Sequence, residues 1–572
     1  MGFETSHHQL QTAIRPMTDS AARLKRICQF SDEVLSLNPR ECQIRAAHGL
    51  IDGQLVEMET GEGKTLSIAL AAAALVQRGH RVRIATANDY LAQRDADWMR
   101  PLYAEMGQAC EVALGQKSSG HADVCYGTLR QFAFEFLRSR TDNPGSLNSD
   151  HEQFGFDVLI IDEADSLLID EARMPMVIHG ASDAIDKQTE ANFRWAASQA
   201  AEYDENDFVI DASRQVALTD AGQRRFFAAS IPPELNSLTT TDLQHAVERA
   251  IYVRRTLQPE EHYLLAGDRI VLVDEFTGRA TPERSFGGGI QQAIEAQHNL
   301  QISTPSHPVA RITTQDFCMN FRHRCGITAT ASDECAELQS VYGLKVTRVD
   351  PFRASQLKVL DPIACRDHDE KIERICDEAQ ATFREGRPVL IGTRTVHESE
   401  LIHDRLLGMR IESSVLNARQ DADEAKIIAR AGQTAVITVA TNMAGRGTDI
   451  PVSDTVRSAG GLHVLVSEMN SVARIDKQLI GRCARQGAPG SARIFVSPDD
   501  FVFTQSFNDS QLEKIRRLPP NRLFAKAQAA QKKLSQRFRM DRIQMAAQER
   551  ELGDAMKTLG LDPCMDLIAD PI

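Results

Sequence analysis

Short apolar runs alternate with longer stretches of helical periodicity in two separate parts of the chain. In the first part the clearest apolar runs lie at 54–59, 81–86 and 156–161. In the second part they lie at 387–392, 414–417, 434–440, 461–466 and 492–496. Short strands separated by helices are typical of a parallel sheet that is covered by helices on both faces. The pattern therefore predicts an α/β protein with two lobes.

Two segments depart from this alternation. Between about 182 and 305 the chain has mixed polar helices and a Pro232-Pro233 turn, which predicts an insertion with its own small core. From 509 to 551 eleven Lys and Arg face five Asp and Glu, and apolar residues recur at near-helical spacing after Pro520. This pattern predicts a long helix. Two interpretations stay open, a solvated helix that packs on the lobes and a docking arm for a membrane surface or a partner.

Composition narrows the class of protein. The chain has 572 residues, 42% hydrophobic and 25% charged, which indicates a globular protein with several cores rather than a disordered chain. Its formal net charge of −14 argues against a general nucleic-acid coat protein. The longest apolar run, 68–76, is far shorter than the roughly 20 residues of a membrane helix, and residues 1–30 lack a signal-peptide layout. We expect a protein that stays in the cytosol or attaches to a membrane from it.

The eleven cysteines contain no C-x-C or C-x-x-C pair. An odd number of cysteines without such pairs is typical of reduced thiols. We therefore expect neither a disulfide framework nor a zinc site.

A glycine-rich segment follows the first predicted strand and begins a predicted helix. It reads Gly61-Glu62-Gly63-Lys64-Thr65. Successive backbone N–H groups in such a loop can surround phosphate oxygens, and the helix N-terminus favours their charge. Lys64 would reach the β- and γ-phosphates of a nucleotide, and Thr65 would ligate Mg²⁺. The pattern G-x-x-x-x-G-K-[ST] fails at its first position, Met58, so a plain glycine-rich turn is the alternative.

Two acids stand directly after the buried strand predicted at 156–161. Asp162 would hold Mg²⁺, and Glu163 would orient or deprotonate the attacking water. Asp274 and Glu275 also follow an apolar run and form a rival site, and only one of the two sites can serve. We prefer Asp162 because it belongs to the same alternation of strands and helices as Lys64. The two motifs together predict a nucleoside triphosphatase.

The second lobe supplies candidate charges for phosphate transfer. Arg482 and Arg485 are three residues apart, so we expect them on one helix face as arginine fingers. A glycine-punctuated loop at 441–449, with Gly447 and Asp449, follows a predicted strand and would sense the nucleotide. The alternative for these residues is a surface cluster of salt bridges.

These motifs together resemble the SecA family, the ATPase motor of bacterial preprotein export, which belongs to the superfamily of DEAD-type helicases. Gln43 lies where the family has its adenine-reading glutamine. The similar segments are 58–65, 87–94, 126–128, 161–173, 273–279 and 291–296. The last two are specific, since an RNA helicase of the same superfamily lacks them. The similarity covers roughly 40 to 500.

The resemblance implies a fold and a domain layout. It implies two RecA-like P-loop lobes, at 1–181 with 306–352 and at 353–508. An inserted preprotein cross-linking domain would occupy 182–305, and 509–572 would be the start of a helical scaffold.

The resemblance also implies an activity and partners. It implies ATP and Mg²⁺ as cofactors and an ATP-driven protein translocase. The implied partners are a SecYEG-type membrane channel, unfolded preproteins and an anionic membrane surface, with a homodimer left open. The implied location is the cytoplasm and the cytoplasmic face of the bacterial inner membrane.

Three departures from the family pattern leave alternatives open. Ala329 stands where the family motif T-G-T-A has glycine, and Ala488 stands where the family has aspartate. The chain ends at Ile572, before the family's two-helix finger and wing would follow, so we expect a short or accessory member. One alternative is an ATP-binding accessory relative that no longer translocates. The other is a nucleic-acid-stimulated ATPase, against which stand the net charge, the 6% aromatic content and the insertion.

Overall fold

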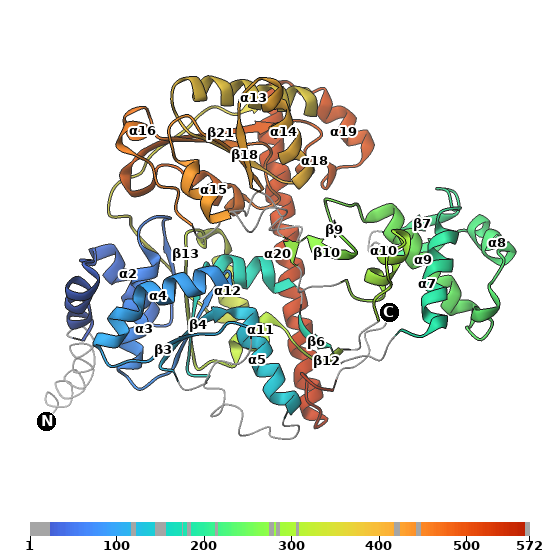
Figure 1. The fold of residues 1–572 in the computed structure, drawn as a ribbon, viewed down its shortest axis with the longest axis horizontal. Coiled ribbons are helices and arrows are strands. Elements are labelled where there is room, and N and C mark those ends of the chain that lie inside the picture. The colour runs from blue at the N-terminus through green and yellow to red at the C-terminus, as the bar shows by residue number, and fades with distance from the viewer. Residues whose placement is uncertain are drawn as a thin grey trace, which may run out of the picture.

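Two α/β lobes and a separate helical insertion make up the computed structural model (Figure 1). The structure describes residues 23–115, 122–142, 156–173, 175–179, 185–211, 215–273, 280–281, 286–304, 308–416, 424–441 and 448–566. The two lobes lie one above the other, the insertion lies to one side, and the long helix α20 runs along both lobes. The predicted α/β class with two lobes is confirmed.

The first lobe contains a seven-stranded sheet in the order β14-β1-β13-β5-β2-β4-β3. All neighbouring strands in it are parallel. The strands are β14 (Val346–Val349), β1 (Leu55–Met58), β13 (His323–Thr328), β5 (Val158–Asp162), β2 (Val82–Thr86), β4 (Val124–Thr128) and β3 (Cys110–Val112). Helix α3 (Lys64–Val76) is apolar on all sides because it is buried between α2 (Glu41–Ile51), the sheet and α4 (Asp89–Glu105).

The second lobe repeats the parallel arrangement, in the order β15-β21-β20-β17-β19-β18, with β16 also paired to β21. Its strands are β15 (Gln356–Val359), β16 (Ile363–Ala364), β17 (Val389–Thr393), β18 (Ser413–Leu416), β19 (Ile437–Thr441), β20 (Leu462–Val466) and β21 (Pro489–Val496). The carboxyl ends of parallel strands meet at one edge of a sheet, where ligands of open α/β sheets bind. Each lobe therefore offers one such edge.

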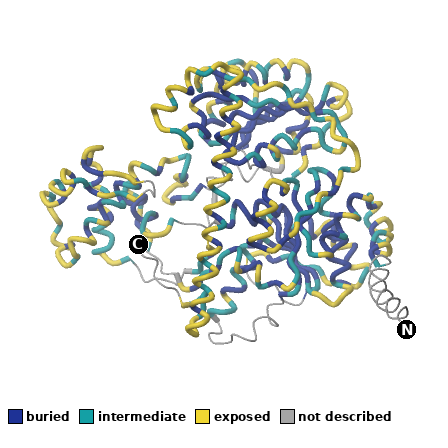
Figure 2. The backbone as a smooth tube through the Cα atoms, turned by 180° about the vertical axis from the view of Figure 1, so that it is seen from behind, coloured by how far each residue is buried: buried dark blue, intermediate teal, exposed yellow. Residues whose placement is uncertain are grey.

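The insertion leaves and rejoins the first lobe through the antiparallel pair β6 (Met176–His179) and β12 (Pro308–Ile312). Its helices are α7 (Lys187–Ala200), α8 (Asp220–Ala228), α9 (Thr240–Thr256) and α10 (Ile290–Gln297). Trp195, Phe226 and Val247 belong to a hydrophobic cluster that contains only residues of this segment. Figure 2 shows the buried stretches of the insertion apart from the buried stretches of the two lobes.

Helix α20 (Pro520–Thr558) confirms the long helix predicted after Pro520, and its inner face packs on both lobes. Gln531 donates to the carboxylate of Asp476 in the second lobe at 2.6 Å. Arg542 forms two hydrogen bonds with the carboxylate of Glu337 in the first lobe, at 2.6 and 2.7 Å. Among the described residues, α20 and the other helices are all too short or too polar to cross a membrane.

A buried cluster of charges supports the second lobe. Lys371 is 1% exposed, and its ammonium lies 2.7 Å from a carboxylate oxygen of Asp500, 3.7 Å from Glu398 and 3.8 Å from Glu468. Burial raises the pKa of Asp500 to about 7, against the opposing attraction of Lys371. Lys371 therefore lies among three buried carboxylates, of which Glu468 also pairs with Arg394 at 2.6 Å, and its removal would leave all three without that partner.

We predict that Lys371→Met lowers the free energy of unfolding by about 3–5 kcal/mol, because it removes one partner of a buried ionic network. Urea denaturation followed by circular dichroism measures the change. Lys358→Met, at an exposed lysine of the same lobe, is the matched control and should stay within about 0.5 kcal/mol of the wild type. Equal effects of the two substitutions would show that the cluster does not stabilise the lobe.

Candidate functional site

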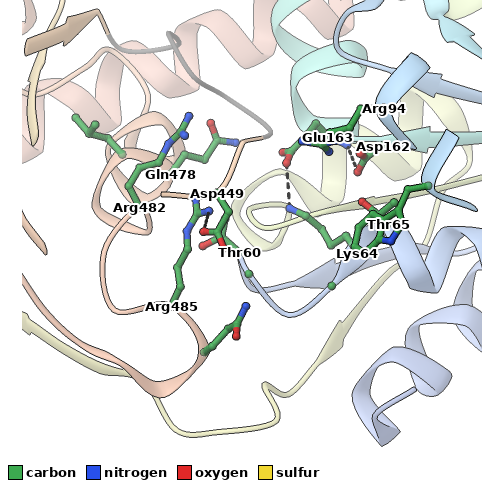
Figure 3. Close-up of a pocket in the computed structure, with 15 residues that line it drawn as sticks. Thr60, Lys64, Thr65, Arg94, Asp162, Glu163, Asp449, Gln478, Arg482 and Arg485 are labelled. Atoms are coloured by element: carbon green, nitrogen blue, oxygen red, sulfur yellow. Dashed lines mark hydrogen bonds and ion pairs between the residues drawn. The ribbon is translucent and has the colours of Figure 1, made fainter. Parts of the chain in front are cut away.

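A cavity of about 490 Å³ lies between the two lobes, where the carboxyl ends of β1 and β5 face helix α17 (Ala473–Ile480) and the turn after it (Figure 3). Its lining comes from the first lobe (Thr60, Gly61, Gly63, Lys64, Thr65, Arg94, Trp98, Asp162, Glu163) and from the second (Asp449, Gln478, Leu479, Arg482, Arg485, Gln486). The structure therefore brings most of the predicted site residues together.

The loop from β1 to α3 needs glycine at two positions. Gly61 and Gly63 have φ of +84° and +90°, in the left-handed region that favours glycine. A Cβ atom on Gly63 would lie 2.1 Å from the side-chain nitrogen of Gln43. Met58, at the first position of the phosphate-loop pattern, is instead the fully buried last residue of β1. The departure at Met58 therefore leaves both left-handed glycines in place.

Lys64 and Glu163 form an ion pair across the cavity, with 3.1 Å between Nζ and Oε1 (Figure 3). Glu163 has φ +51°, an uncommon backbone conformation for a residue with a side chain. Such outliers cluster at functional sites, where the surrounding structure holds them. The pair and this backbone conformation therefore make Lys64 and Glu163 the candidate catalytic residues of the cavity.

Asp162 lies beside this pair, and its carboxylate accepts the backbone N–H of Glu163 at 3.0 Å. Burial and the neighbouring charge of Glu163 raise the pKa of Asp162 to about 7. Asp162 and Thr65 offer oxygen donors, which Mg²⁺ prefers, and a bound cation would stabilise the ionised carboxylate. The residues present thus fit Mg²⁺. The rival acids Asp274 and Glu275 lie outside the described residues.

Gln43 and Glu62 lie behind the loop rather than in the cavity lining. The amide of Gln43 donates to the carbonyl of Glu62 at 2.9 Å and accepts the N–H of Arg40 at 2.8 Å. The buried carboxylate of Glu62 accepts the N–H of Phe352, in the segment that links the two lobes, at 3.1 Å. In this structure both side chains position the phosphate loop, and the reading of adenine by Gln43 stays a prediction.

The expectation that Arg482 and Arg485 share one helix face was wrong. Helix α17 ends at Ile480, and Gly481 follows as its C-cap. Ala484 and Gln486 then adopt left-handed conformations, with φ of +57° and +53°. The chain therefore turns before Arg485, so the spacing of three residues no longer corresponds to a helical turn.

Both arginines nevertheless line the cavity. Arg482 donates to the backbone carbonyl of Thr448 at 3.0 Å. Arg485 donates to the carboxylate of Asp449 at 2.6 Å (Figure 3). Gly447 lies outside the described residues. The alternative interpretation was a surface cluster of salt bridges, and the ion pair of Arg485 with Asp449 agrees with it in part.

A buried network across the two lobes was missed at the level of sequence. Asp165, 0% exposed, accepts hydrogen bonds from the hydroxyls of Thr328 at 2.6 Å and Thr330 at 2.7 Å. It also accepts one from the amide of Gln478 in the second lobe, and that amide donates to Thr330 at 3.0 Å as well. Arg474 of α17 makes a two-pronged ion pair with Asp170 of the first lobe. Both lobes are therefore joined by buried polar groups next to the cavity.

The two alanines that depart from the family pattern fit without backbone strain. Ala329 is absent from the non-glycine residues with positive φ in the described part of the chain. Ala488 is extended, with φ −72° and ψ 152°, and its N–H donates to the carbonyl of Arg485 at 2.9 Å. Neither departure therefore strains the backbone.

Arg94 and Trp98 also line the cavity and were not predicted as site residues. They are four residues apart on α4, so they lie on one face of that helix. The sequence does contain a signal for them: the two residues are four apart in a helix that directly follows β2, the strand beside β5.

Comparison with known proteins identifies the family. The family model of the SecA DEAD-like domain matches residues 5–339, and that of the SecA P-loop domain matches 361–456 and 451–518. Protein translocase subunit SecA 2 of Rhodopirellula baltica is 36% identical over 570 residues, covering 93% of this chain and 87% of the relative. Protein translocase subunit SecA of Lawsonia intracellularis is 37% identical over 482 residues, covering 82% and 57%. That of Campylobacter jejuni is 35% identical over 482 residues, covering 81% and 56%.

The chain thus spans little more than half the length of the last two relatives. Among solved structures, the DEAD-box helicase Mss116 bound to ssRNA and UDP-BeF covers 86% of this chain and 77% of its own, at 12% identity and a TM-score of 0.41. The fold assignment rests on the two parallel sheets and the family models rather than on this overlap. The chain belongs to the SecA family.

Proposed function

We propose that the chain is an ATP-driven motor that moves unfolded preproteins through a SecYEG-type channel. The observation that carries this proposal is the cavity between the lobes, in which a phosphate loop, two acids and two arginines converge. Family membership makes the chain a P-loop ATPase. The names of its relatives support coupling of this activity to protein translocation.

The pair of Lys64 and Glu163 explains how nucleotide binding and hydrolysis would be linked. Lys64 binds Glu163 in this structure. To reach the phosphates of ATP, Lys64 must give up this partner, and the carboxylate of Glu163 is then free to orient and deprotonate a water molecule. Thr65 and Asp162 would hold Mg²⁺, which supplies positive charge against the phosphates when bound. Hydrolysis would then require that the phosphate loop is already occupied.

The second lobe would complete the site from the opposite side. Arg482 and Arg485 are held near the cavity by Thr448 and Asp449, so a small rearrangement can direct a guanidinium to the γ-phosphate. The buried contacts of Gln478 and Arg474 with the first lobe would transmit this closure. Closing and opening of the lobes on each ATP is the step that would move the rest of the molecule.

The other parts of the chain take roles in this proposal. The insertion, placed at 182–305, would grip the preprotein, and the first lobe would consist of 1–181 and 306–352. The second lobe would cover 353–508, and 509–572 would begin the scaffold. The motor would work in the cytoplasm and on the cytoplasmic face of the bacterial inner membrane, where anionic lipids attract basic segments such as that of α20.

We predict that steady-state ATP hydrolysis rises several-fold only when unfolded preprotein and channel-bearing membranes are added together. The reason is that a motor releases product fastest when its substrate and track are both engaged. The comparison arms are preprotein alone, membranes alone and RNA. Stimulation by RNA with a steep dependence on salt would favour the nucleic-acid alternative. Hydrolysis that ignores all additions would favour the accessory relative that no longer translocates.

We predict that Lys64→Ala abolishes ATP binding, whereas Glu163→Gln keeps binding and lowers the rate of hydrolysis by about 10²–10⁴-fold, the usual contribution of a general base. Isothermal titration calorimetry measures binding, and phosphate release measures the rate. Lys358→Ala, at an exposed lysine of the second lobe, is the matched control for loss of a positive charge. Equal loss of binding in both site variants would contradict the separate roles.

A further inference from the structure

The cavity between the lobes has one aromatic side chain in its described lining, that of Trp98. Trp98 is 49% exposed, although tryptophan is highly buried on average. No hydrogen bond of its N–H is found among the described residues. Trp98 therefore presents a large apolar surface to a cavity that is lined mainly by polar and charged residues.

The position of Trp98 on α4 shows which side of the cavity it lines. Arg94 lies one helical turn before it, on the same face of α4. Figure 3 shows Arg94, Asp162 and Glu163 on the first-lobe side of the cavity, with Arg485 and Asp449 on the opposite side. Trp98 therefore lines the cavity from the first lobe, as the two acids do.

The chemistry of the first-lobe side gives an aromatic wall a purpose. Thr65 and Asp162 are the oxygen donors that fit a divalent cation, and the attraction between a cation and a carboxylate grows when water is excluded. A rigid indole excludes water over a large area at a low cost in side-chain entropy. It also adds no competing charge next to the cation.

We propose that the indole of Trp98 forms the side wall of the metal end of the nucleotide site. It packs against the bound metal–nucleotide and shields Thr65 and Asp162 from bulk water, so it is a positioning residue. This inference rests on the proposed nucleotide site. It adds a residue to that site and a way to follow its occupancy.

The chain offers a direct readout because it contains only two tryptophans. Trp195 is 7% exposed in the core of the insertion, where its indole N–H donates to the carbonyl of Ser230 at 3.0 Å. Trp195→Phe therefore leaves Trp98 as the single fluorescent reporter. The experiment measures quenching of its fluorescence by acrylamide, with and without Mg²⁺ and a non-hydrolysable ATP analogue. A second arm replaces Mg²⁺ by paramagnetic Mn²⁺.

We predict that the metal–nucleotide lowers acrylamide quenching by about twofold or more, because the site closes over the indole and expels water. Mn²⁺ with the analogue should quench the fluorescence more strongly than Mg²⁺ with the analogue. Lys64→Ala in the same background should remove both responses. Trp98→Ala should raise the Mg²⁺ concentration needed for half-maximal hydrolysis several-fold, and Trp98→Phe should restore it.

The second tryptophan supplies the matched control. Trp98→Phe alone leaves Trp195 as the single reporter, buried in the core of the insertion. This variant should show no change in acrylamide quenching on nucleotide binding.

Calorimetry on the same proteins separates the possible failures. If the analogue binds while the fluorescence of Trp98 stays unchanged and Trp98→Ala behaves as wild type, the inference is wrong and the nucleotide site stands. If the analogue does not bind at all, both the proposed nucleotide site and the inference fall.

Discussion

The buried carboxylate of Asp165 is the interaction on which the geometry of the cavity depends. It lies just beyond the end of β5 and receives two threonine hydroxyls from the first lobe and the amide of Gln478 from the second. A buried carboxylate that loses its donors is costly, so these groups hold a single arrangement. Gln478 lies in the last turn of α17 and Arg482 follows two residues after that helix ends, so the same contact sets where Arg482 stands relative to the phosphate loop.

Further contacts on both sides of Asp165 explain how movements of the two lobes are coupled. The hydroxyl of Thr60, in the phosphate loop, donates to the carbonyl of Gly481 at 2.7 Å, next to the arginines. Helix α20 holds Glu337 in the first lobe and Asp476 in the second, close to the segments that carry Thr330 and Gln478. A movement of one lobe therefore changes contacts in the cavity and along α20. A motor needs such coupling between its nucleotide site and the rest of the molecule.

The sequence was sufficient to predict both parallel sheets, the phosphate loop and the acids after β5, because each depends on local patterns of apolar, glycine and acidic residues. It failed for Arg482 and Arg485, since the helix ends at Ile480 and the backbone turns through left-handed residues that spacing does not reveal. The bonds of Asp165 join residues more than 160 positions apart, and the side-chain contacts of Gln43 depend on the fold of the loop. Contacts between segments far apart in the sequence form only once the chain has folded, so local sequence patterns do not predict them.

A double-mutant cycle between Asp165 and Gln478 tests the central claim, that a buried contact between the lobes controls hydrolysis. The rate of single-turnover ATP hydrolysis would be measured for Asp165→Asn, Gln478→Leu and the double variant. We predict a coupling energy above about 1 kcal/mol in the activation free energy, as expected for residues in one hydrogen-bond network. Additive effects of the two substitutions would show that the lobes are not coupled through this contact.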